Sequence, residues 1–236
     1  MRILDIDMDF FQTEINSFDD DSLIHWNNDC VEIWDKDRFI SFLELQCGLS
    51  KKERIKGRIF NFHKNTYYVI QDLIESGRVQ PPISITHIDA HSDMAFDTSI
   101  RYYRFLKTLN KDNNADFERK TLFDGKNHEY INSGNYLVAL ALNAWVDEIT
   151  YVYHETTTML DFSENYIRCV VPREEFEFNF FGETNIPWTK IKVKSGREYK
   201  NNGKYDYICV AISPSYTIRD IAKLVDILKD YIDIEE

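Results

Sequence analysis

The chain has 236 residues, which favours a single domain of residues 1–236 with a substantial buried core. Hydrophobic residues make up 43% and aromatic residues 14% of the chain, which excludes a disordered polypeptide. The net charge of -12 argues against nucleic-acid binding through a basic surface and is compatible with a cationic partner. No stretch approaches 18 consecutive apolar residues, so we expect a soluble, cytoplasmic protein with no membrane partner.

The first segment, residues 3–11, alternates aspartates with apolar side chains. An extended strand with this period places Asp5, Asp7 and Asp9 on one face, which cannot be ordinary apolar core. The polar and acidic residues 12–36 that follow indicate a long excursion or a lid.

The rest of the chain alternates strand and helix patterns. Short apolar segments predict strands over residues 58–63, 83–88, 149–154, 167–171 and 207–212. Apolar residues at helical spacing predict helices over residues 38–47, 65–77, 134–145 and from Thr217 to about Ile232. We expect Gly48 to end the first helix and Asp220 to form an acidic capping box with Thr217. The alternation predicts an α/β fold in which helices cover both faces of a mainly parallel sheet.

Two aspartate-rich segments follow predicted strands. Asp89, His91 and Asp93 come directly after strand 83–88, and Asp7 and Asp9 end the first strand. The carboxyl ends of parallel strands open into a ligand-binding crevice. Carboxylates that face each other at close range repel unless a cation neutralises them. These segments therefore predict a metal site.

The types of ligand narrow the choice of metal. Carboxylates with one or two imidazoles and no thiolate suit Mn²⁺, with Fe²⁺, Co²⁺ or Zn²⁺ as alternatives. More than one aspartate per ion points to two ions, and a two-metal site is typical of hydrolysis. We expect His87, two residues before Asp89, to support the ligands rather than to bind metal.

Several motifs resemble known families. Residues 89–93, D-A-H-S-D, match the D-A-H-x-D signature of the arginase and agmatinase ureohydrolases, and residues 5–9 resemble their S-x-D-x-D signature. With F-H-K at 62–64, S-G-N-Y-L at 133–137 and I-S-P-S-Y-T at 212–217, the chain is more similar still to the family UPF0489, whose bacterial members include peptide arginases. The two aspartate motifs stand in the opposite order to that of arginases. The resemblance therefore implies an arginase-like, three-layer α/β/α fold with a rearranged motif order.

The resemblance also implies a set of site residues. Two Mn²⁺ ions would be bound by six ligands, of which Asp7 and Asp89 would bridge: Asp7, Asp9, His63, Asp89, His91 and Asp93. Asp93 would additionally orient the attacking water. Ser133 and Asn135 would bind the substrate, although Gly134 and Asn135 are equally compatible with a simple helix start.

One arginase residue has no counterpart. Leu137 stands where arginases have a histidine that shuttles protons, so we expect His154, or alternatively His128, to take that role. An acidic residue is needed to hold a guanidinium group. Glu155 is the first choice, and Asp161 or an acid of residues 12–36 is the alternative.

The sequence thus predicts a binuclear manganese hydrolase. Its substrate would be an arginine-containing precursor peptide made by ribosomes, whose arginine side chains it would convert to ornithine with release of urea. Two other activities remain open: a metal-dependent amide hydrolase or deacetylase, and a ureohydrolase of free arginine or agmatine. A non-enzymatic, metal-stabilised protein that binds a leader peptide is the third alternative.

Overall fold

The computed structural model describes residues 1–16, 22–95, 99–100, 123–124, 128–156, 175–178 and 189–235. For residues 123–124, 128–129 and 175–178 it describes the backbone alone. The strand predicted over 167–171 and the alternative acid Asp161 lie outside the described residues.

The centre of the fold is an eight-stranded sheet with the strand order β10-β2-β9-β1-β3-β6-β8-β7. Its strands are β1 (Arg2–Asp7), β2 (Ile55–Phe60), β3 (Ile83–Asp89), β6 (Val146–Tyr153), β7 (Glu175–Phe178), β8 (Thr189–Ser195), β9 (Tyr207–Ala211) and β10 (Ile232–Ile234). The seven strands from β10 to β8 are all parallel, and β7 is added antiparallel at the edge. Strands β4 (Phe123–Asp124) and β5 (His128–Glu129) form a separate antiparallel pair. The predicted α/β fold with a mainly parallel sheet is confirmed.

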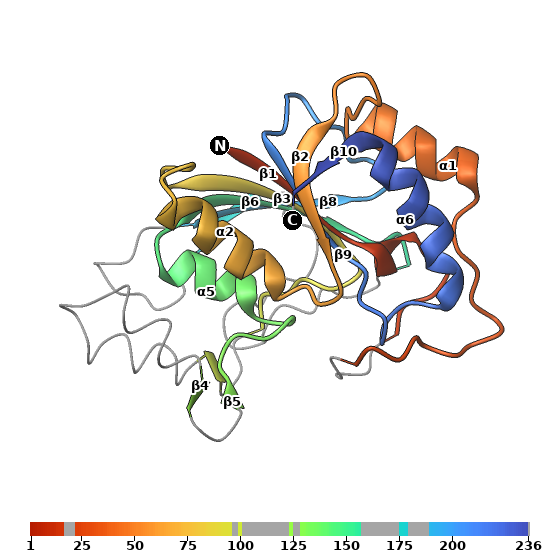
Figure 1. The fold of residues 1–236 in the computed structure, drawn as a ribbon, viewed down its shortest axis with the longest axis horizontal. Helices are drawn as coiled ribbons and strands as arrows, with labels where there is room; N and C mark the ends of the chain where they lie inside the picture. The colour runs from red at the N-terminus through yellow and green to blue at the C-terminus, as the bar shows by residue number, and fades with distance from the viewer. Residues whose placement is uncertain are drawn as a thin grey trace.

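Helices cover both faces of the sheet (Figure 1). Helices α2 (Asn65–Glu75) and α5 (Tyr136–Leu142) lie on one side, and α1 (Lys36–Ser41) and α6 (Ala222–Leu228) lie on the other. Each side has its own buried apolar cluster. Along β1, Ile3 belongs to the α2–α5 cluster, whereas Leu4 and Ile6 belong to the α1–α6 cluster, because successive side chains point to opposite faces. The result is a three-layer arrangement.

The first strand is shorter than its alternating pattern predicts. β1 ends at Asp7, and Met8–Phe11 form a 3-10 turn, η1. The reason is local: the Asp7 carboxylate accepts a hydrogen bond from the Asp9 backbone N–H at 3.0 Å and so caps the turn. The prediction that Asp9 shares the strand face of Asp5 and Asp7 was therefore wrong, although Asp9 is buried at the same end of the sheet.

The predicted ends of other elements also shift. The last helical segment begins after Ile218 with the 3-10 turn η3 (Arg219–Ile221), and no side chain caps it, so the predicted capping box was wrong. The Thr217 hydroxyl instead donates to the carbonyl oxygens of Ile212 and Ser213. After α6 and the 3-10 turn η4 (Lys229–Tyr231), Ile232 begins β10 and pairs with Ile55 of β2.

The first helix behaves as its sequence predicts. α1 continues into a π-helical turn, η2 (Phe42–Gln46), and Gly48 follows with a φ of 72°, the left-handed conformation that glycine adopts most readily. Within the described residues, no helix is both long and apolar enough to cross a membrane.

Gly57 in β2 provides a test of the sheet's packing. A Cβ at this position would lie 2.4 Å from the carbonyl oxygen of Ile208 in the neighbouring β9, and a backbone atom in a central strand cannot move away cheaply. We expect Gly57→Ala to lower the free energy of unfolding by about 1–3 kcal/mol, measured by urea denaturation. Gly134→Ala is the control, since its nearest neighbour would lie at 3.6 Å. Equal stability of the two variants would contradict this account.

Candidate metal centre

Four neighbouring strands bring predicted ligands together where their carboxyl ends meet. Asp7 ends β1, Asp89 ends β3, and His63 and Ser213 lie three and two residues beyond the ends of β2 and β9. These strands are adjacent in the order β2-β9-β1-β3. Because all four are parallel, their carboxyl ends meet at the same edge.

The first group of ligands surrounds one imidazole nitrogen. His63 Nδ1 lies 2.9 Å from Asp89 Oδ2, 2.9 Å from Asp93 Oδ2 and 3.1 Å from Asp7 Oδ2. A single nitrogen cannot donate to three carboxylates at once. Indeed, His63 Nδ1 and Asp93 Oδ2 are buried without a hydrogen-bond partner among the described residues. Adjacent ligand atoms around an ion at about 2.1 Å lie about 3 Å apart, so this donor set fits a metal ion.

A second group lies beside the first. Asp9, Asp89 and His91 also bring one ligand atom each into close proximity. His91 Nδ1 lies 3.0 Å from Asp9 Oδ2 and 3.7 Å from Asp89 Oδ1. Asp89 therefore belongs to both groups and turns a different oxygen to each, as a bridging carboxylate does. The His91 side chain is 25% exposed and that of His63 is 1% exposed, so solvent reaches the second group more easily.

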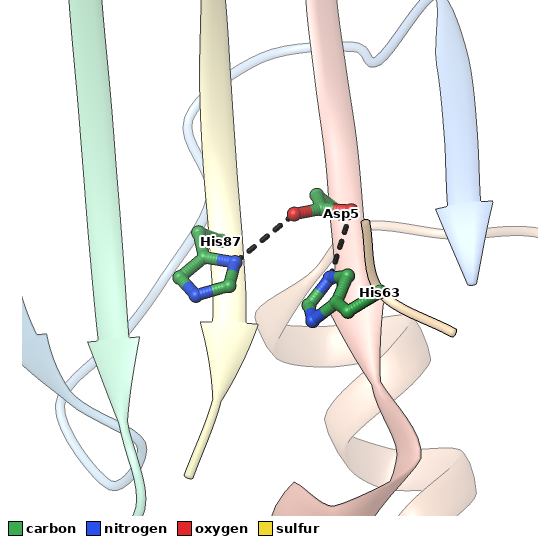
Figure 2. Close-up of side chains that lie close together, drawn as sticks. All are labelled: Asp5, His63 and His87. Atoms are coloured by element: carbon green, nitrogen blue, oxygen red, sulfur yellow. Dashed lines mark hydrogen bonds and ion pairs between the residues drawn. The ribbon is translucent and has the colours of Figure 1, made fainter. Parts of the chain in front are cut away.

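Asp5 supports the far side of His63. Figure 2 shows the Asp5 carboxylate between His63 and His87, with Oδ1 at 3.1 Å from His63 Nε2 and Oδ2 at 3.0 Å from His87 Nδ1. The hydroxyl of Tyr136 donates to Asp5 Oδ2 at 2.5 Å, and that of Thr66 donates to Oδ1 at 2.8 Å. A carboxylate on the outer nitrogen of a ligand histidine fixes the orientation of the ring.

His87 occupies an intermediate position. Its Nε2 lies 3.2 Å from the carbonyl oxygen of His91 and 3.4 Å from Asp89 Oδ2. It contacts Asp5 with the other nitrogen, as a supporting residue would. It also completes two further groups of closely spaced donors, one with Asp5 and His63 and one with Asp89 and Asp93.

The sequence patterns did not identify every residue of the centre. Ser213 Oγ donates to Asp7 Oδ2 at 2.5 Å, and Ser213 and Asp93 both adopt positive φ angles, of 48° and 51°. Such backbone conformations are unfavourable for residues other than glycine and concentrate at functional sites. The sequence indicates only a helix for Thr66, and it places Tyr136 in the S-G-N-Y-L motif without a role for its hydroxyl. The acidic motif alone does not reveal its hydroxyl partners, because these come from distant segments.

The burial of several aspartates at one point governs their ionisation. Burial, together with the charge of Asp7, raises the pKa of Asp9 well above its usual value. Burial and the charge of Asp89 raise the pKa of Asp93 to about 7. At Asp5, burial acts in the same direction, but the charge and hydrogen bond of His63 outweigh it and hold the pKa well below its usual range. Without a metal, the cluster keeps its charge balanced by holding protons.

His154 and Glu155 have other partners. His154 Nε2 lies 2.9 Å from the carbonyl oxygen of Gln12, and Nδ1 lies 2.7 Å from Thr156 Oγ1. Both ring nitrogens are thus engaged, which disfavours the proton-shuttle role expected of His154. The Glu155 carboxylate forms ion pairs of 2.5 Å with Arg38 and with Arg197. Neither residue belongs to the described groups of clustered donors.

The two expected substrate-binding residues, Asn135 and Ser133, differ in their contacts. Asn135 Oδ1 accepts from the Asn132 N–H at 2.9 Å, and its Nδ2 donates to the Tyr130 carbonyl at 3.2 Å. Asn135 therefore holds the loop before α5 together, as the helix-start interpretation predicts. Ser133 Oγ accepts from the backbone N–H of Lys64 at 3.4 Å, directly beside His63. The structure describes only the backbone of His128, the alternative shuttle.

Comparisons with protein-family models, with curated proteins and with solved structures found no match for this chain. Fold and geometry therefore define its class. It is a parallel α/β protein whose buried aspartate and histidine clusters could hold metal ions.

The shared role of Asp89 predicts how metal content responds to substitution. We expect the wild-type chain to bind two Mn²⁺ ions, Asp9→Asn to keep one and Asp89→Asn to lose both, since Asp89 joins the two groups, whereas Asp7, the second bridge that the resemblance implies, lies in the first group alone. Metal analysis after gel filtration measures the ratio directly. Asp226→Asn, on the exposed surface of α6, serves as the control. Two ions bound to Asp89→Asn would refute the bridging assignment.

Without metal, we expect removal of the Asp93 charge to stabilise the folded protein. Its pKa rises from 3.8 to about 7 in the folded protein, so stability is lost as the pH rises between these values and the full cost remains above about pH 7. At pH 8 with a chelator, we expect Asp93→Asn to raise the free energy of unfolding by up to about 4 kcal/mol. The gain should vanish near pH 4.

Denaturation at both pH values, with and without Mn²⁺, checks this prediction. Asparagine also tolerates the positive φ at this position, but that contribution does not change with pH. In wild type, added Mn²⁺ should stabilise the fold, whereas Asp93→Asn should respond much less. A gain of the same size at pH 4 and pH 8 would rule out charge repulsion as its cause.

Proposed function

We propose that this protein is a metal-dependent hydrolase that uses two ions, with Mn²⁺ as the metal. The observation that carries the proposal is the pair of buried donor groups that share Asp89 at the carboxyl edge of the sheet. Two ions held by these residues would supply a water of lowered pKa and would stabilise negative charge that develops in the reaction.

The chain's own residues would then have distinct tasks. Asp7, Asp9, Asp89, Asp93, His63 and His91 hold the ions in this proposal, as the sequence motifs imply. Asp93 would accept a hydrogen bond from the attacking water, the role that the resemblance implies. Asp5 keeps His63 in orientation through Nε2. The exposed side of His91 gives the substrate access to the second group.

The charge of the chain as a whole favours a cationic substrate. The four aspartates among the proposed ligands, Asp7, Asp9, Asp89 and Asp93, would balance two divalent cations, and Asp5 is paired with His63 and His87. The net charge of -12 attracts a guanidinium group at long range more strongly than a neutral amide.

The finer proposal is a peptide arginase. The enzyme would convert arginine side chains of a peptide to ornithine: water adds to the guanidinium carbon, the bond to the side-chain nitrogen breaks, and urea leaves. The resemblance of the aspartate motifs to ureohydrolases and to the peptide-arginase family supports this choice. Ser133, beside the His63 segment, is our first choice for a contact with the peptide backbone.

Incubation of the Mn²⁺-loaded protein with an arginine-containing peptide tests the proposal. We expect mass spectrometry to show conversion of arginine to ornithine and a colorimetric assay to show an equal amount of urea. Asp89→Asn should abolish both signals, whereas Asp226→Asn should match wild type.

Other outcomes would replace the proposal. Turnover of free arginine or agmatine without turnover of peptides would identify a small-molecule ureohydrolase. Release of a carboxylic acid from an acylated amine would identify an amide hydrolase. If the protein binds two ions and turns over none of these substrates, the proposed arginase activity is wrong although the metal centre stands.

A further inference from the structure

A cavity of about 250 Å³ lies between α1 and the segments that follow β6 and β8. Aromatic side chains lie at its base: the ring of Phe10 packs 5.7 Å from that of Trp34 and 5.6 Å from that of Phe42, centre to centre, and Phe10 is fully buried whereas Trp34 and Phe42 are 7% and 3% exposed. Since β6 and β8 run parallel to β1 and β3, the cavity opens at the same edge of the sheet as the candidate metal centre. It is smaller than pockets that enclose drug-sized ligands and suits one amino-acid residue.

The polar part of the cavity carries an excess of positive charge. Arg38 lies over the Trp34 ring at 3.5 Å from its centre, and both Arg38 and Arg197 form ion pairs with Glu155. Two guanidinium groups thus share one carboxylate among the described residues that line the cavity. The side chain of Arg197 is 76% exposed and that of Arg38 is 41% exposed. Each guanidinium has five N–H donors, so both retain donors for a second anion.

Gln46 contributes a hydrogen-bond acceptor that needs a donor. Its side chain lines the cavity, and its Oε1 atom is buried without a hydrogen-bond partner among the described residues. A buried acceptor in this condition is unfavourable until a donor reaches it. The ligand that fits all three features has a carboxylate, an N–H group and an apolar body.

We propose that this cavity binds the carboxylate-terminated apolar residue of a peptide. The carboxylate lies against Arg38 and Arg197, the N–H group donates to Gln46 Oε1, and the side chain packs against Trp34 and Phe42. Phe10, at the base of the cavity, directly follows Asp9 of the metal centre. The proposal concerns binding alone and does not depend on the proposed hydrolase activity.

Matched small probes test this assignment on the full chain. N-acetyl-phenylalanine carries the three required features, and N-acetyl-phenylalanine amide lacks only the carboxylate. Trp34 reports binding through its fluorescence, and Trp34→Phe supplies the blank. We expect a saturable change with the acid and at least tenfold weaker binding of the amide, because hydrogen bonds to charged groups contribute about 1.5–3 kcal/mol each.

Arg197→Gln should weaken binding of the acid by about tenfold and leave the fold intact, since this side chain is largely exposed. Arg219→Gln removes an exposed positive charge in η3, away from the cavity lining, and should bind as wild type does. Equal binding of acid and amide, no effect of Arg197→Gln, or no saturable change with the acid would overturn the proposal. So would preferential binding of N-acetyl-arginine amide, which would show that the cavity selects a cation.

Neither N-acetyl-phenylalanine nor its amide is a substrate of the proposed arginase reaction, because neither contains a guanidinium group, and the fluorescence signal requires no turnover. Failure of the binding experiment therefore leaves the proposed hydrolase untouched. Conversely, a protein without arginase activity can still bind the acid at Trp34.

Discussion

The rest of the structure depends on one constraint, the burial of five aspartates within and just beyond the last residues of β1 and β3. A buried carboxylate is tolerated only where hydrogen bonds, cations or protons balance it. Three histidines are packed among these aspartates: His63, His87 and His91. The aspartates make His63 easier to protonate, and its pKa is raised well above the usual value even though burial opposes the shift. A metal ion would balance the negative charge of the aspartates without a proton. We therefore interpret the cluster as a metal centre rather than as a structural salt bridge.

Helices α2 and α5 supply side chains that stabilise the buried Asp5 carboxylate. Asp5 shares its side of β1 with Ile3, and therefore faces the α2–α5 layer. Thr66 of α2 and Tyr136 of α5 both donate to its carboxylate. The two helices thus bury apolar surface and also supply the hydroxyl groups that make a charged residue acceptable in the middle of a strand. Packing and electrostatics fix the position of His63 together.

The alternation of strands and helices, the parallel sheet and the gathering of the aspartate motifs followed from the sequence, because apolar periodicity and strand ends are local properties. The ion-pair partners of Glu155 could not be predicted from the sequence. A carboxylate after a strand predicts a site acid, yet Arg38 and Arg197 reach it from far along the chain. Asn135 was ambiguous for the same reason, since a loop-closing and a substrate-binding amide have identical local sequences. The turn at Met8–Phe11 was missed because its alternating residues also satisfy a strand.

That turn has a consequence for how the two sites relate. Had β1 continued to Phe11, Asp9 would have stayed in register with Asp5 and Asp7. The 3-10 turn instead places Asp9 beside Asp89 and His91. Phe10 still packs in the same apolar cluster as Leu4 and Ile6 and lies at the base of the aromatic cavity. Adjacent residues of one capped turn therefore contribute to the metal centre and to the cavity.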